Sequence, residues 1–236
     1  MSKGLLFSRS IPITEKISVF VPTIGEILED EDAYNSALNS IIATPYDLMV
    51  QLDKLGIDFE TISEYELFLR LFEGLQKSDT HLIFGDLDLS KFHFAEMKND
   101  NSIILYDEYN GIIINKSIHN KICRELRRIN NLKKNSKKPG NAEGKKYMLE
   151  RARKKQERLA RMKNNKSQLE DLIVALVNTE QFKYDFESVK KLTIYQFNKC
   201  LSQVIKKINY DNTMIGCYAG TVDINKLNPD DYNWLS

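Results

Sequence analysis

In much of this chain, a helix-capping residue is followed by apolar residues spaced three and four positions apart. This spacing restricts the fold more than any other feature. Ser63 is the clearest cap and predicts a helix over residues 64–75. The apolar stripe of that helix comprises Tyr65, Leu67, Phe68, Leu71 and Phe72. Thr23 with Glu26 has the pattern of a capping box and predicts a helix from residue 24. The same spacing predicts helices over 33–42, 46–55, 117–131, 194–208 and 210–219, and residues 169–177 are expected to form a further buried segment.

The spacing changes to short β-branched and aromatic runs in the middle of the chain. These runs are 82–84, 92–97, 102–106 and 111–114, with turn-forming residues between them. They predict an antiparallel meander of three or four strands, which is too small to be stable without a helix against one face. We expect the helix over 117–131 to cover it. Residues 17–21 predict a further short strand or an extended arm.

Positive charge is concentrated in residues 133–166, which hold fourteen lysines and arginines against three glutamates. The whole chain has a formal net charge of only +1, so the remaining residues must be acidic overall. Pro139 and Gly140 break the first part of this segment into a loop, and residues 145–165 are rich in helix formers. The apolar stripe of this helix is thin and cations surround it, which predicts a helix that projects from the body.

These patterns predict an α+β fold that is predominantly helical, a helical bundle with a small antiparallel β-meander and a projecting basic helix. The chain has only ten glycines and five prolines, which disfavours a sandwich or barrel dense in tight turns. We expect four parts along the chain. They are an N-terminal arm and helical unit at 1–78, the meander with its covering helix at 79–132, the basic loop and helix at 133–166, and a C-terminal helical unit with an acidic tail at 167–236.

The basic helix is a candidate partner-binding surface. Its expected contact stripe comprises Arg151, Lys154, Lys155, Arg158 and Arg161. Three interpretations stay open: a solvated helix, a site for an acidic protein partner, and a site for nucleic acid. Base stacking needs aromatic residues between the cations, and here only Tyr147 meets that need.

A second set of candidate contacts is aromatic and lies near the C-terminus. It comprises Phe182, Tyr184, Tyr195 and Trp234. Aromatic residues gathered at one end of a helix belong to the core more often than to a docking surface, so both roles stay open for the first three. A terminal tryptophan beside acidic residues is typical of an interface anchor.

Catalytic motifs are absent from the sequence, which has no GxxxxGK[ST], GxGxxG, HExxH, GxSxG or CxxC. Cys123 lies between cations on a predicted helix, where its pKa could be lowered, but a small core residue is the commoner role. Asp86 and Asp88 with Asp79 could hold Mg²⁺, although a polar turn is the commoner role for such a run. A metal shared by the histidines would need the meander to bring together His81, His93 and His119. We therefore expect no enzyme and no cofactor.

The compartment follows from the cysteines and from the apolar runs. Cys123, Cys200 and Cys217 are widely spaced, which is typical of buried thiols in a reducing compartment. The sequence has neither the pattern of a secretion signal nor an apolar run long enough for a membrane span. We expect a soluble intracellular protein that does not bind a membrane.

The last third of the chain has a pattern made of residues 166–184 (KSQLEDLIVALVNTEQFKY), 192–199 (LTIYQFNK) and 210–220 (YDNTMIGCYAG). Residues 135–141 and 227–234 look like parts of the same pattern. This pattern resembles proteins encoded in the tail-morphogenesis region of phages and prophages of Gram-positive bacteria. The resemblance implies a tail assembly chaperone, which coats the tape-measure protein and is displaced as tail-tube subunits polymerise. It also implies a location in the cytoplasm of the bacterial host or in the virion.

We therefore predict a non-enzymatic phage tail assembly protein, chaperone-like, that acts through protein–protein contacts. Its expected partner is a phage structural or tape-measure protein, and homo-oligomers are a further expectation. The leading alternative is a nucleic-acid-associated phage protein that uses the basic helix. The third interpretation is a metal-dependent nuclease built on Asp86 and Asp88.

Overall fold

The computed structural model describes residues 4–97, 101–161, 167–228 and 233–235 of the chain. The fold is α+β with helices predominating, as the sequence predicts. In the described residues the strands form one two-stranded and one three-stranded antiparallel sheet. Among the same residues, no helix has the length and apolar character needed to span a membrane.

The N-terminal part begins as an arm and continues as helices. The arm holds the 3₁₀ turn η1 (Leu5–Phe7) and the paired strands β1 (Ser10–Pro12) and β2 (Ser18–Phe20). The helices are α1 (Ile24–Glu29), α2 (Glu31–Ile42), α3 (Met49–Lys54) and α4 (Glu64–Leu75). The predicted capping box of Thr23 with Glu26 is formed, and Ser63 caps α4 in the same way, so both predicted helix starts are confirmed.

Two helix starts differ from the prediction. The helix predicted from residue 33 begins at Glu31, because the Asp30 side chain caps it. The helix predicted from residue 46 begins only at Met49, because Thr44 and Asp47 hold a turn before it. The backbone N–H of Thr44 donates to the Asp47 carboxylate over 2.9 Å, and the Thr44 hydroxyl accepts from the Asp47 N–H over 3.3 Å.

The central part is the predicted meander with its covering helix. It contains α5 (His81–Phe84), η2 (Leu89–Lys91), β3 (His93–Glu96), β4 (Ile103–Asp107), β5 (Ile112–Ile114) and α6 (Lys116–Ile129). The strand order is β3-β4-β5, and α6 packs against β5, β2, α2 and α4. The strand predicted at 82–84 is wrong. That run forms one helical turn, because the Thr80 carbonyl accepts from the N–H groups of Ile83 and Phe84.

The C-terminal part is helical. Its elements are α7 (Ala142–Arg161), α8 (Gln168–Val177), α9 (Phe186–Val189), α10 (Ile194–Tyr218) and the 3₁₀ turn η3 (Ile224–Lys226). Thr193 caps α10 as predicted. The prediction of two helices over 194–208 and 210–219 is wrong, since α10 runs unbroken for 25 residues. Neither glycine nor proline stands at residues 208–210 to interrupt it.

Backbone hydrogen bonds join the start of α10 to the N-terminal body. The N–H of Ile194 donates to the Pro22 carbonyl over 2.9 Å, and the N–H of Gly25 donates to the Lys190 carbonyl over 3.0 Å. A Cβ on Gly25 would stand 3.1 Å from that carbonyl oxygen, so a side chain there would crowd the junction. The segment before α10 is therefore held directly on α1.

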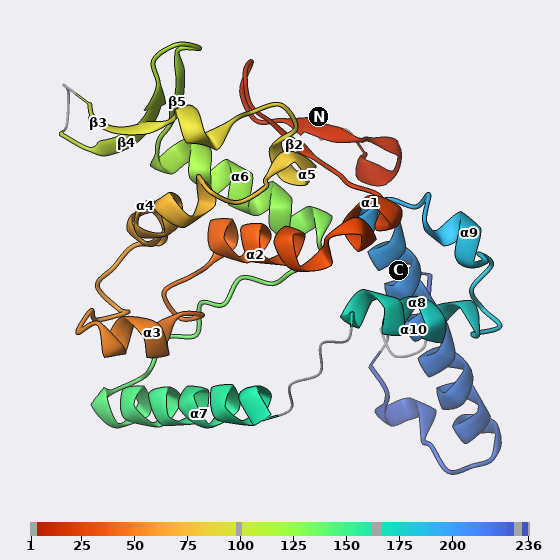
Figure 1. Ribbon diagram of the computed structural model, residues 1–236. Coiled ribbons are helices and arrows are strands. Elements are labelled where there is room, and N and C mark those ends of the chain that lie inside the picture. The colour runs from red at the N-terminus through yellow and green to blue at the C-terminus, as the bar shows by residue number, and fades with distance from the viewer. Residues whose placement is uncertain (1–3, 98–100, 162–166, 229–232, 236) are drawn as a thin grey trace.

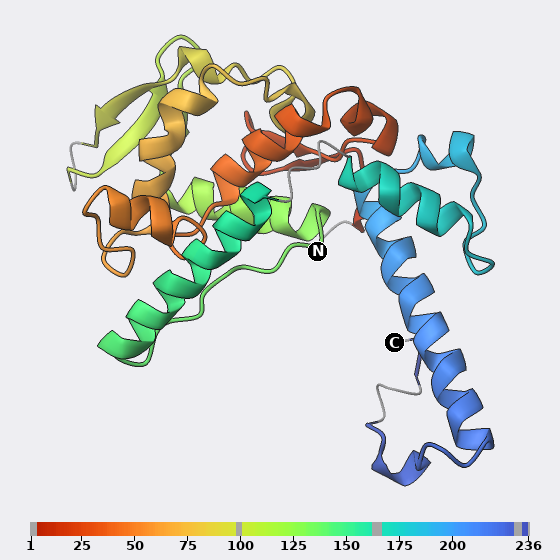
Figure 2. The same ribbon diagram turned by 60° about the horizontal axis from the view of Figure 1, so that its bottom comes forward.

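Two clusters of buried side chains support this arrangement. The main core spans the body from the arm to α10, and among its most buried members are Ile17, Phe72, Phe92, Leu105, Ile129 and Phe197. The smaller core lies around α3 and includes Met49, Val50, Leu52, Phe59 and Leu67. Figure 1 shows α7 alongside α3 beneath the body. Figure 2 shows α10 extending away from the body on the opposite side.

Candidate functional site

The basic helix α7 docks on α3 by one side and exposes its cations on the others. Met148, Leu149 and Ala152 pack against the smaller core, and no residue of α7 is fully buried. Lys145 Nζ pairs with Asp58 Oδ1 at 2.6 Å and so fixes the first turn. The predicted contact stripe is exposed at every position, Arg151, Lys154, Lys155, Arg158 and Arg161. The helix therefore lies along α3, and it is the cationic side chains that extend into solvent.

The aromatic residues predicted as contacts do not gather into one surface. Phe182 is buried in the main core, and its ring centroid lies 5.3 Å from that of Tyr184, which is 38% exposed. Tyr195 is half-buried at the start of α10. Trp234 is half-buried beside the far part of α10, where Lys207 Nζ lies 5.5 Å from its ring centroid.

Two of the carboxylates considered for metal binding, those of Asp79 and Asp88, have other partners. Asp79 accepts from His81 Nδ1 over 2.8 Å. Asp88 caps η2, and hydrogen bonds from Ser90 hold the pKa of its carboxyl below the ordinary value. In the described part of the chain, no three His, Cys, Asp or Glu side chains gather in a way that could hold a metal ion.

His119 and Cys123 form a buried pair on α6. Cys123 Sγ lies 3.2 Å from His119 Nε2, which is 3.0 Å from the Ile41 carbonyl oxygen. Burial lowers the pKa of His119 to about 4 and raises the pKa of Cys123 to about 12. The cations near Cys123 therefore do not lower its pKa below the ordinary value. At neutral pH the pair is an uncharged imidazole and a thiol, without the thiolate that a cysteine nucleophile requires.

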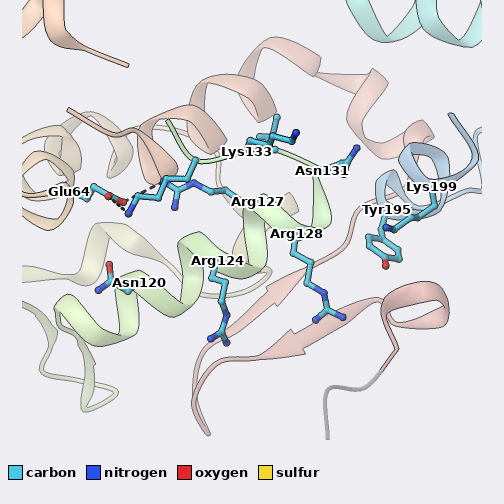
Figure 3. A pocket seen from close by; sticks show the side chains of 11 residues that line it. Glu64, Asn120, Arg124, Arg127, Arg128, Asn131, Lys133, Tyr195 and Lys199 are labelled. Atoms are coloured by element: carbon cyan, nitrogen blue, oxygen red, sulfur yellow. Dashed lines mark ion pairs between the residues drawn. The ribbon is translucent and has the colours of Figure 1, made fainter. Parts of the chain in front are cut away.

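A groove lies between α6, residues 131–134 and the start of α10 (Figure 3). It was not predicted from the sequence. Its volume is about 630 Å³. It is lined by Glu64, Asn120, Arg124, Arg127, Arg128, Asn131, Leu132, Lys133, Lys134, Tyr195 and Lys199. The lining is thus rich in cations and amides and contains one aromatic ring.

Glu64 on α4 fixes one end of the groove. Its carboxylate pairs with Arg127 at 3.5 Å and also with Lys134. The Arg127 side chain is only 12% exposed, and its Nη2 donates to the Ile42 carbonyl over 2.5 Å. Arg127 is therefore held by the protein, whereas Lys134 is half exposed at the groove surface.

Glu125 holds Arg124 and Arg128 of α6 in place through ion pairs. This buried carboxylate pairs with Arg124 at 2.9 Å and with Arg128 at 3.3 Å. Figure 3 shows both arginines extending to the same side of α6. With Lys133 and Lys199, the lining holds six cations, and the carboxylates of Glu64 and Glu125 offset only two of them.

Part of the signal for this groove is present in the sequence. Arg124, Arg127 and Arg128 stand at positions i, i+3 and i+4, a spacing that places them near one another on a helix. Tyr195 and Lys199 show the same i, i+4 relation on α10. Nothing in the local spacing indicates that the two sets meet, because only folding brings α10 beside α6.

The second half of α10 exposes apolar side chains. Val204 is the last buried residue of the helix. Beyond it, Ile205 is 49% exposed, Ile215 is 65% exposed and Tyr218 is 84% exposed. We call residues 205–218 distal α10.

Comparison with known proteins places a match on this same part of the chain. A family model described as the YomV second domain matches residues 160–236, which contain α8, α9 and α10. No curated protein and no solved structure matches the chain. YomV is a phage-type protein, and the match supports a phage origin. Residues 160–236 are therefore similar to the second domain of the phage-type protein YomV.

Proposed function

We propose that this chain is a non-enzymatic phage assembly protein of the tail-assembly-chaperone kind, which acts through protein–protein contacts. The observation that carries the proposal is the exposure of Ile215 and Tyr218, which lie about one turn apart on distal α10. Both residues lie in the segment that matches a phage-type domain. An apolar helix surface that its own chain leaves uncovered is typical of a site where another protein docks.

The length and exposure of distal α10 fit a helical partner. At 1.5 Å per residue, the helix continues about 20 Å beyond its last buried residue. In proteins, most of the stability of a helix comes from tertiary packing of its apolar face. A partner that covered Ile215 and Tyr218 would contribute about 2 kcal/mol for each side chain buried. Packing on a second helix would therefore stabilise both elements.

The exposed cations of α7 provide a second contact surface in this proposal. They favour a partner with an acidic face, since long-range attraction brings such a face toward the helix. A long helical tape-measure protein with apolar and acidic positions has both required features. Tyr184 and Trp234 remain predicted contacts beside these two surfaces.

Complementation of a phage that lacks the gene tests the proposal. Wild-type protein supplied from a plasmid is expected to restore tailed particles, counted by electron microscopy. The double variant Ile215→Asp, Tyr218→Ser should fail, because losing two apolar side chains that the partner would bury costs about 4 kcal/mol, which lowers partner affinity by up to about 700-fold. The matched control is Tyr109→Ser on the turn between β4 and β5, where the tyrosine is 92% exposed. It should restore tails as wild type does.

Two outcomes would count against the account. A phage without the gene that still assembles normal tails would exclude an assembly role. Full rescue by the distal α10 variant would exclude that helix as the contact surface. Substituting glutamate at the five positions of the α7 stripe then tests the second surface separately.

A further inference from the structure

We propose that the cationic groove between α6 and α10 binds single-stranded nucleic acid. This goes beyond an assembly role, because the groove lies apart from the exposed residues of distal α10. The proposal rests on three features of the groove: its excess of cations, its aromatic ring and its amide side chains.

The charge of the groove suits a chain of phosphates. Six cations line it, and two carboxylates offset only part of that charge. Arg124 and Arg128 are 73% and 40% exposed at their side chains, so their guanidinium groups are open to a ligand. Guanidinium groups in this arrangement donate to phosphate oxygens with defined geometry. The lysine-rich segment that follows α6 extends the basic surface past the groove through the exposed Lys137 and Lys138.

Tyr195 and the amides distinguish nucleic acid from an acidic polypeptide. The Tyr195 ring is half-buried in the groove wall, and Lys199 Nζ lies 5.5 Å from its centroid. An aromatic ring beside cations is a stacking platform for an unpaired base, a role that the carboxylates of a peptide do not use. Asn120 and Asn131 are exposed in the same lining and offer donors and acceptors to base edges. A single strand, whose bases are accessible, can use all three groups.

Fluorescence anisotropy with a labelled twelve-nucleotide oligothymidylate and the full-length protein tests this inference. With four uncompensated cations, the logarithm of affinity should fall with the logarithm of salt concentration at a slope of about −3. The double variant Lys133→Ala, Lys199→Ala should reduce the magnitude of this slope by about 1.4. The matched control Lys54→Ala, Lys77→Ala removes two exposed cations elsewhere and should leave the slope unchanged.

Variants of Tyr195 test the stacking of a base on its ring separately from the charge of the groove. Tyr195→Leu should weaken binding at least about fivefold, whereas Tyr195→Phe, which keeps the ring, should retain it. Thermal unfolding followed by circular dichroism checks that the leucine variant is folded. Equal binding of Tyr195→Leu would overturn the proposal. Equally tight binding of an oligoglutamate with the same number of charges would overturn it too, and would assign the groove to an acidic protein segment.

Discussion

Replacing Phe197 by alanine is expected to lower the free energy of unfolding by about 3–5 kcal/mol. Phe197 is 0% exposed and lies in the main core, one turn after the point where α10 is joined to the N-terminal body. Removing its ring leaves a cavity whose walls come from distant parts of the chain and cannot all move to fill it. Urea denaturation followed by circular dichroism measures the change.

Phe186 is the matched control for this truncation. Its ring is 49% exposed at the start of α9, so the same change should cost less than about 1 kcal/mol. A comparably small loss for Phe197→Ala would contradict the placement of α10 against the body. The start of α10 would then not be held on the body, and the position of distal α10 would not be fixed relative to it.

Acidification from pH 7 to pH 4 is expected to remove about 3 kcal/mol of stability through His119 alone. Burial lowers the pKa of this histidine from 6.5 to about 4, so the folded protein holds the ring uncharged. The ring stacks on Phe68 with 4.2 Å between centroids. The unfolded chain takes up a proton at this residue below pH 6.5, whereas the folded protein does so only near pH 4. Its contribution is therefore complete above pH 6.5 and is lost as the pH falls toward 4.

The variant His119→Phe isolates this effect, because phenylalanine keeps an aromatic ring against Phe68 and does not titrate. The difference in unfolding free energy between wild type and variant should shift by about 3 kcal/mol between pH 7 and pH 4. Groups that do not contact this residue contribute to both proteins and cancel in the difference. His81→Gln is the control, since His81 is exposed. A pH-independent difference for His119→Phe would show that the imidazole is not buried as described.

The helix starts that carry a capping box were predictable from the sequence because these caps act locally. Thr23 and Ser63 bind backbone groups within the first turns of their helices, so the same spacing of three residues between cap and glutamate is visible in the sequence and in the structure. The helical turn at 82–84 was not predictable from its β-branched and aromatic composition, since Ile83 and Phe84 are buried by tertiary packing. Tertiary contacts decide such short apolar runs.

The candidate site was predictable only in part, for the same reason. The exposure of the α7 stripe follows from its composition. The groove depends on the approach of α10 to α6, and on the way Glu125 holds Arg124 and Arg128 in place. Such approaches are long-range, and spacing along one helix carries no information about them. The exposure of Ile205 was likewise not predictable, because its helical spacing from Leu201 is that of a core face.

Site-specific photo-crosslinking in infected cells tests the docking surface most directly. A photoreactive phenylalanine analogue replaces Tyr218, which is 84% exposed on distal α10, and in a parallel strain replaces Tyr109. Position 218 is expected to crosslink to a phage tail or tape-measure protein, identified by mass spectrometry, whereas position 109 is not. Absence of a phage protein from the crosslinks at position 218, with the protein folded and expressed, would contradict this expectation.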